Sequence, residues 1–260
     1  MEQLNTKLTL RAKLIIAFVI VALVPLFILA MWNARITRRA LIDDANQALF
    51  AVAAQTTASL DNFISANLNA IETEARLPAL ASYLSLPPAD RPGSLEEQEV
   101  KALLDALGGK SQHITSYALL DSQGVDVADT STSDVGLDKS DREYYQIFRA
   151  GEAEDRAYVS PILVSQTTGD AALYFSSPVY DAAGEMIGLL RVRYGADALQ
   201  ELLAQKNDQA GPGSFGVLFD EYHIHLAHGI EPDVNFIPIV RFDAAETAEL
   251  KAVSYTHLTL

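Results

Sequence analysis

The chain has 260 residues, with 34 acidic against 19 basic side chains and a formal net charge of −15 at pH 7. A chain this acidic is repelled by a phosphate backbone, which argues against nucleic acid as a partner. The absence of cysteine excludes disulfides, zinc–thiolate sites, iron–sulfur clusters and cysteine nucleophiles.

The first predicted element is a membrane helix over residues 14–32, an uncharged apolar run that follows a leader of residues 1–13. At 1.5 Å per residue this run spans about 28 Å, close to the thickness of the hydrocarbon layer. The alternative is a cleaved signal peptide, whose apolar region usually has only about 7–15 residues. The length therefore favours a retained anchor. Three basic residues on each side leave the orientation undecided, but the short leader favours a cytoplasmic N-terminus and an exported body.

A long helix is predicted over residues 35–76, where neither proline nor glycine occurs. Its apolar stripe packs on its own domain, pairs with a second subunit, or does both; we expect a homodimer. A further helix is predicted from Leu95 to Leu107, after the break at residues 87–93. The stripe of the long helix consists of Leu49, Val52, Leu60, Phe63, Ile64, Leu68 and Ile71.

Short apolar runs joined by turns follow, which predicts an α+β fold with antiparallel sheets. Three turns begin with aspartate and span residues 121–124, 181–184 and 220–223. Aspartate and glycine suit tight turns, because the carboxylate binds backbone amides and glycine tolerates positive φ. The first two turns are expected in one sheet. The third follows a predicted helix (196–207) and a Gly-Pro-Gly linker, so it is expected to open a second module.

Two local motifs are interpreted as structural. Gly211–Gly216 matches the GxGxxG pattern, but a strand is predicted after it where a dinucleotide site needs a helix, so it is interpreted as a linker. His223, His225 and His228 could ligate zinc if a strand aligned them. Turn or packing roles are the preferred interpretation, so neither a metal nor a cofactor is predicted. The sequence also shows no catalytic constellation.

The order of several segments resembles the double Cache family of extracytoplasmic sensor domains. These segments are the anchor with its long helix and the motifs at 141–145 (DREYY), 158–161 (YVSP), 168–169 (TG) and 177–188 (SPVYDAAGEMIG). The resemblance implies a PAS-like, membrane-distal, ligand-binding module (77–210) and a membrane-proximal module beginning at 211–252. It also implies a receptor in a bacterial inner membrane that returns to a cytoplasmic output. A histidine kinase is the expected output; a chemoreceptor, a cyclase or a tethered binding protein without output are the alternatives.

The resemblance also implies a ligand pocket. Amino-acid-binding members resemble one another in an Arg-x-Trp-Tyr segment, to which Arg142, Tyr144 and Tyr145 correspond. The acids that hold a ligand ammonium in those members are missing here, and Arg193 stands at the position of one of them. Arg in place of Asp favours an anion, so we expect a small organic acid as the ligand. Tyr158 and Ser165 complete the candidate site.

Two structural alternatives remain open for this site. Arg193 could instead pair with a neighbouring acid or face water. For at least one of the two tyrosines, Tyr144 or Tyr145, core packing alone is the favoured role.

The C-terminal residues 253–260 (VSYTHLTL) are expected to be foreign to the gene. They match the in-frame translation of a transposon-end adapter used in sequencing libraries. On this hypothesis the natural sequence continues past residue 252, and the second module is cut short.

Overall fold

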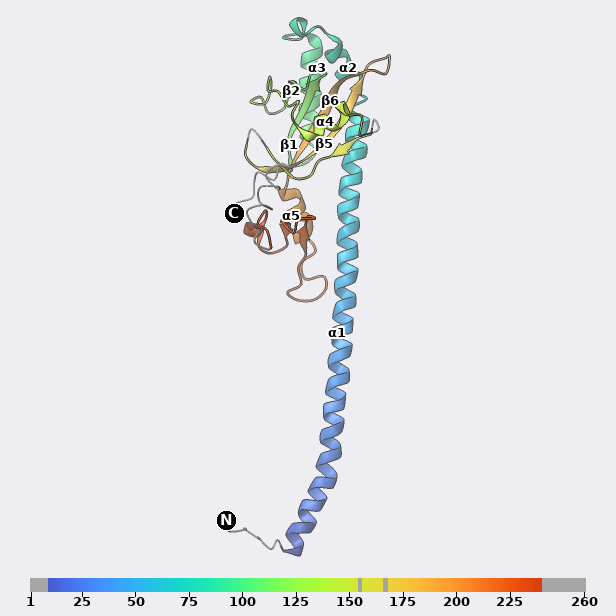
Figure 1. Ribbon diagram of the computed structural model, residues 1–260, viewed down its shortest axis with the longest axis vertical. Helices are drawn as coiled ribbons and strands as arrows, with labels where there is room; N and C mark the ends of the chain where they lie inside the picture. The colour runs from blue at the N-terminus through green and yellow to red at the C-terminus, as the bar shows by residue number, and fades with distance from the viewer. Residues whose placement is uncertain (1–8, 154–155, 166–167, 240–260) are drawn as a thin grey trace. The chain divides into compact units, whose positions relative to one another are not determined.

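The computed structural model describes residues 9–153, 156–165 and 168–239 (Figure 1). The predictions for residues 240–260, including the foreign tail, lie outside the described residues, as does most of the leader. The chain divides into two units, residues 1–52 and 53–260. The first described helix is α1 (Leu10–Glu74), which contains the predicted membrane segment and the predicted long helix except for its last two residues. Among the described residues, α1 is the one helix long and apolar enough to cross a membrane.

The second unit is built on an antiparallel sheet in the order β2-β1-β6-β5-β3, with β4 also paired to β5. The predicted turns at Asp121 and Asp181 join β1 to β2 and β5 to β6, which confirms that both lie in one sheet. In each turn the carboxylate accepts hydrogen bonds from two backbone amides. The strands are β1 (Ile114–Asp121), β2 (Asp126–Asp129), β3 (Tyr158–Val159), β4 (Leu163–Val164), β5 (Ala171–Tyr180) and β6 (Met186–Gly195).

One face of this sheet packs against helices and holds the larger hydrophobic core. The C-terminal part of α1 contributes Phe63, whose ring meets Phe175 and Tyr194 edge-on at centroid distances of 6.1 and 5.5 Å. The predicted stripe therefore packs on its own domain between Leu60 and Ile71, while pairing with a second subunit stays a prediction. The other helices at this core are α2 (Pro78–Ser85), α3 (Leu95–Gly108) and α5 (Asp197–Ala204).

The opposite face of the sheet carries a smaller apolar cluster and several charged side chains. Successive residues of a strand point to opposite faces, so β6 gives Val192 to the large core and Arg191 and Arg193 to this second face. The short helix α4 (Glu143–Arg149) covers part of it, and the Ser176 hydroxyl of β5 donates to the carbonyl of Tyr144 at 3.1 Å. This second face holds the candidate site.

The described C-terminal part forms a separate two-stranded sheet of β7 (Val217–Phe219) and β8 (His225–His228), followed by η2 (Pro232–Val234). The third predicted turn joins these strands, as expected. The Gly211–Gly216 segment leads into β7 and not into a helix, so it lacks the helix N-terminus that a dinucleotide requires. His223 adopts φ 60° in the turn, so it does not share a strand face with His225.

Candidate functional site

Strand register brings charged and aromatic side chains together on the second face of the sheet. Arg191 lies opposite Ala118 of β1, and Arg193 lies opposite Tyr174 of β5. Because residues two apart share a face, Arg191 and Arg193 project side by side from β6. The segment between β2 and α4 passes over them and supplies Asp134 and Lys139.

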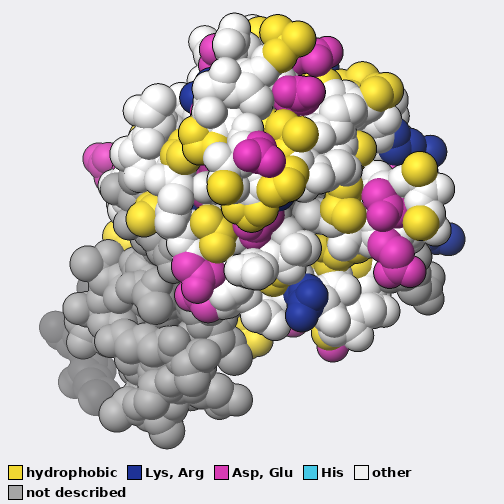
Figure 2. All heavy atoms as spheres, turned by 90° about the horizontal axis from the view of Figure 1, so that it is seen from above, with side chains coloured by type: hydrophobic (Ala, Val, Ile, Leu, Met, Phe, Trp, Pro, Cys, Tyr) yellow, Lys and Arg dark blue, Asp and Glu magenta, His cyan; other side chains and the backbone are white. Residues whose placement is uncertain are grey.

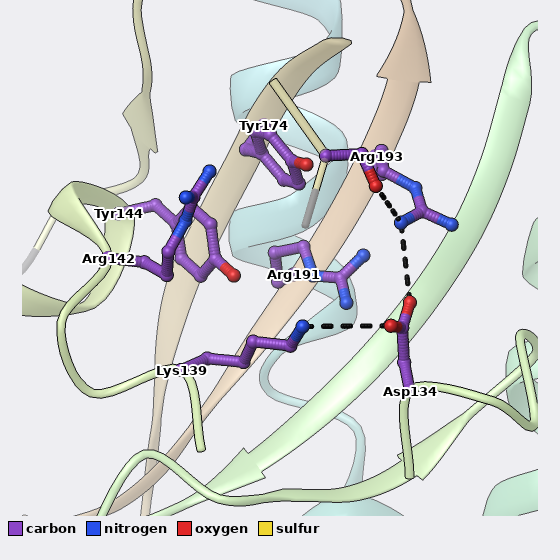
Figure 3. Close-up of a pocket in the computed structure, with 8 residues that line it drawn as sticks. Asp134, Lys139, Arg142, Tyr144, Tyr174, Arg191 and Arg193 are labelled. Carbon is purple, nitrogen blue, oxygen red and sulfur yellow. Dashed lines mark hydrogen bonds and ion pairs between the residues drawn. The ribbon is translucent and has the colours of Figure 1, made fainter. Parts of the chain in front are cut away.

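Eight residues enclose a small pocket at this position (Figure 3). Four of them are cationic and one is acidic, whereas the chain as a whole has a net charge of −15. On the face drawn in Figure 2 the composition differs, because acidic side chains lie among apolar ones and only scattered lysine and arginine appear. The pocket is therefore a buried cationic site within an acidic protein. Its lining consists of Asp134, Lys139, Arg142, Tyr144, Ser165, Tyr174, Arg191 and Arg193.

The cavity between these side chains has a volume of about 10 Å³. A space of this size holds about one water molecule. A ligand larger than water can therefore enter only if some of the lining side chains move apart.

Arg193 is buried, and its guanidinium has partners on three segments. Its Nε donates to Thr115 Oγ1 at 3.0 Å, and its Nη1 donates to Ser165 Oγ at 2.9 Å and to Asp134 Oδ2 at 3.3 Å. Pairing with a neighbouring acid, one of the two alternatives left open above, therefore occurs. Asp134 also lies 3.6 Å from Lys139 Nζ, so this single carboxylate serves two cations of the pocket.

Arg191 is only 1% exposed and forms the floor of the pocket. Its Nη1 donates to Ser116 Oγ at 2.7 Å and its Nη2 to Asp129 Oδ2 at 3.0 Å. Asp126 Oδ2 lies 3.5 Å from the same Nη2. A buried guanidinium is stable only with compensating acceptors, and Ser116 and Asp129 supply them.

The remaining wall of the pocket is aromatic. The rings of Tyr144 and Tyr174 stack with centroids 4.9 Å apart and an interplanar angle of 27°. The Arg142 guanidinium lies 5.9 Å from each ring centroid, within the range of a cation–π contact. Burial is the main cause that raises the pKa of Tyr144 to about 12, so its hydroxyl stays protonated at neutral pH. A protonated hydroxyl beside three guanidiniums can donate to an anion.

The structure brings four of the six predicted site residues to this pocket: Arg142, Tyr144, Ser165 and Arg193. Tyr144 both packs in the core cluster and lines the pocket.

The other two predicted site residues lie outside it. The Tyr145 hydroxyl donates to the carbonyl of Ser122 at 2.8 Å, because successive residues of α4 diverge by about 100° around the helix. The Tyr158 hydroxyl donates to Glu143 in the first turn of α4.

Four lining residues were not among the predicted site residues: Asp134, Lys139, Tyr174 and Arg191. Alternation along the two strands could have identified both Arg191, on the same face of β6 as Arg193, and Tyr174 of β5. Asp134 and Lys139 lie between β2 and α4, where no periodicity indicates which side chains point inward. Backbone hydrogen bonds from Asp126 to Leu137 and from Gly136 to Asp126 hold this segment against β2.

The donors of this pocket suit an anion better than a metal ion. Guanidinium and ammonium groups donate hydrogen bonds and do not coordinate cations. Within the described ranges, no group of three histidine or acidic side chains has the arrangement of a metal site.

A family model described as Cache domain matches residues 33–252 of the chain. A comparison with curated proteins gives no match.

Solved structures provide similar folds at low identity. The sensor domain of the V. cholerae histidine kinase DctB has 16% identity and a TM-score of 0.64 over 86% of this chain and 80% of that chain. The ligand-binding domain of the Campylobacter jejuni chemoreceptor Tlp3 with 4-methylisoleucine has 17% identity and a TM-score of 0.55, covering 79% and 77%. The ligand-binding domain of the Pseudomonas aeruginosa amino-acid chemoreceptor PctC with GABA has 18% identity and a TM-score of 0.50, covering 72% of this chain and 77% of that chain. At such identities the similarity extends to the fold alone.

Proposed function

The chain belongs to the Cache domain family over residues 33–252, and from this premise we propose that it is the extracytoplasmic sensing part of a bacterial transmembrane receptor for a small organic anion. The observation that carries the ligand class is the composition of the pocket, with four buried or half-buried cations and one acid. The proposed binding residues are Arg142, Tyr144, Ser165 and Arg193, joined by Arg191, Lys139 and Tyr174.

An α-amino acid fits this pocket poorly. The ammonium group of such a ligand needs a carboxylate partner in a buried site. The one lining carboxylate, Asp134, is within 3.3 Å of Arg193 and 3.6 Å of Lys139. An ammonium would therefore meet like charges, whereas a carboxylate would meet guanidiniums and the Tyr144 hydroxyl. This difference supports an organic acid over the isoleucine-like and GABA ligands of the structural neighbours.

The membrane anchor is proposed to be α1, with the sensing unit on the outer side of a bacterial inner membrane. The side chains from Leu14 to Trp32 are apolar all round the helix and exposed in the chain. A helix of this kind fits a lipid environment, because lipid replaces the missing protein partners. The PAS-like module over 77–210 and a second module from 211 complete the proposed arrangement.

The output is proposed to be a histidine kinase. The similarity to the DctB sensor domain supports it, and the similarity to the Tlp3 and PctC domains supports a chemoreceptor as the second candidate. Sequencing the genomic locus through codon 252 and beyond distinguishes them. A phosphoacceptor and ATPase region would establish a kinase, a long coiled-coil signalling region would establish a chemoreceptor, and a true stop after Leu260 would refute both.

Signalling in this proposal follows from the closed pocket. Because its volume is about 10 Å³, a bound acid must displace part of the lining. A ligand shifts a conformational equilibrium only when it binds one state more tightly than the other. The expanded pocket is the state that the ligand favours.

The ligand class is tested by thermal stability of the full chain in lipid nanodiscs. Acetate, propionate and succinate are compared with acetamide, propionamide and succinamide, and with L-isoleucine and GABA. A ligand at about 100 times its Kd stabilises the folded state by about 2.7 kcal/mol. We expect at least one carboxylate to raise Tm while its amide does not. Stabilisation by the amino acids alone would overturn the anion assignment.

A further inference from the structure

A carboxyl group that is not part of the pocket lining lies directly behind it. Asp126, the first residue of β2, is 0% exposed, and among the described residues neither of its side-chain oxygens has a hydrogen-bond partner of good geometry. It pairs with Arg191, whose Nη2 lies 3.5 Å from Asp126 Oδ2 and 3.0 Å from Asp129 Oδ2. One guanidinium nitrogen therefore faces two carboxyl groups, and Asp129 has the closer contact.

The charge around Arg191 depends on which of these carboxyls is ionised. With Asp126 and Asp129 both ionised, the four cations of the pocket face three carboxylates, including Asp134, and the cluster has a net charge of +1. With Asp126 protonated the cluster has a net charge of +2. In the second case the cluster offers one more unit of positive charge to a ligand carboxylate, although Asp129 pairs with Arg191 in both.

The surroundings of Asp126 favour its protonated form. Burial is the largest of the effects that raise the pKa of Asp126 to about 9, and the charges of Asp129 and Asp134 act in the same direction against the opposing charge of Arg191. Tyr144 of α4 is the titratable group that faces Asp126 from the helix side, and its own pKa is raised. The groups that face Asp126 are therefore Arg191 from β6, Asp129 from β2, Asp134 from the following segment and Tyr144 from α4.

We propose that Asp126 sets how strongly the pocket binds an anion: its protonated carboxyl leaves the cluster with a net charge of +2, and its ionised carboxylate lowers that charge to +1. Proton uptake by Asp126 and anion binding are then coupled, and the coupling is reciprocal. This inference rests on the proposed function, because it concerns the same anion site. It adds a residue that sets the charge of the site without lining the pocket.

The first experiment measures acetate affinity against pH, with the full chain in nanodiscs and acetamide as the neutral control ligand. Acetate stays ionised across the range, so its own titration does not contribute. Affinity is expected to be constant below the pKa of Asp126 and to fall above it, by at most tenfold for each pH unit. Asp126→Asn replaces the carboxyl group by an amide that is neutral at every pH. It is therefore expected to make the affinity for acetate independent of pH. Asp105→Asn, the same change on the exposed surface of α3, is expected to leave the wild-type profile intact.

The second experiment needs no ligand. Infrared difference spectroscopy detects the carbonyl stretch of a protonated carboxylic acid, which ionised carboxylates lack. At neutral pH the wild-type chain is expected to show this band, and Asp126→Asn is expected to lose it while Asp105→Asn retains it. The band is expected to disappear as the pH rises above about 9.

The two experiments separate the inference from the function on which it rests. A missing acid band at neutral pH, or acetate affinity that stays constant in the wild type as the acid band disappears, overturns the role of Asp126 and leaves the anion site standing. Acetate that binds no better than acetamide at any pH overturns the anion site, and the inference with it. The wild-type profile decides these outcomes even if Asp126→Asn fails to fold.

Discussion

Arg191 of β6 and Asp129 of β2 form a buried ion pair across the intervening strand, with Nη2 donating to Oδ2 at 3.0 Å. The residue between them is Ala118 of β1, which is the register partner of both. Its methyl group leaves the space through which the guanidinium reaches β2. The pocket floor therefore depends on a small side chain at one position of the central strand.

Ala118→Leu is expected to destabilise the fold and displace Arg191. Overpacking a buried position costs about 1–3 kcal/mol, and here the added atoms occupy the path of the guanidinium. Urea unfolding followed by near-ultraviolet circular dichroism, to which the buried tyrosines contribute, measures the loss. Ala106→Leu on the exposed surface of α3 is the matched control and should stay within about 0.5 kcal/mol of the wild type. Equal stability of the two variants would contradict this packing.

Arg191→Met is expected to lower the free energy of unfolding by about 3–5 kcal/mol, because it leaves the Asp129 carboxylate buried without its cation. Adding Asp129→Asn removes that stranded charge, so the double variant should recover part of the loss. The same urea transitions measure this cycle. Strictly additive losses would mean that the two residues do not interact.

Asp126 is expected to make the free energy of unfolding fall as the pH rises. Its folded-state pKa is raised to about 9, above the value of about 3.9 in an unfolded chain. The folded state therefore binds more protons between these values, and this contribution to stability is lost as pH rises through that window. Relative to the wild type, Asp126→Asn should gain stability with rising pH, by up to about 1.4 kcal/mol per unit below pH 9. If the free energy of unfolding changed with pH in the same way in both proteins, Asp126 would be ionised in the folded state.

Dimerisation through α1 is testable because the chain has no cysteine. We expect Leu49→Cys, on the apolar stripe, to form a disulfide-linked dimer in membranes under mild oxidation. Ala51→Cys lies about 200° around the helix and is the matched control, with slower crosslinking expected. Monomers alone at both positions would count against the proposed homodimer.

The sequence predicted the elements better than the contacts between them. Turn residues at Asp121 and Asp181 are local features, and the structure confirmed both hairpins. The alternation along β6, which places Arg191 and Arg193 on one face, is a local feature as well. The acid that partners Arg193 could not be predicted in the same way. Asp134 lies 59 residues before it in the chain, in a segment without periodicity, and only tertiary packing brings it within 3.3 Å.

The candidate site shows the same limit in its aromatic residues. Tyr144 and Tyr145 are neighbours in the sequence, and both were candidate ligand contacts, with core packing expected for at least one of them. The helical turn of α4 sends Tyr144 to the stack with Tyr174 and Tyr145 to the carbonyl of Ser122. A motif match fixes where such residues lie along the chain, but the direction of each depends on how α4 sits on the sheet.

The anion site is tested most directly by a pair of arginines on one short segment. Arg142 precedes α4 and lines the pocket, whereas Arg149 ends α4 and is exposed. Acetate and acetamide are titrated into the wild-type chain, Arg142→Gln and Arg149→Gln in nanodiscs, each checked for an unchanged unfolding transition. We predict that acetate binds the wild type and Arg149→Gln alike and binds Arg142→Gln at least tenfold more weakly, the equivalent of about 1.4 kcal/mol. Equal acetate affinity in all three proteins, or acetamide binding as well as acetate, would contradict a cationic pocket that recognises a carboxylate.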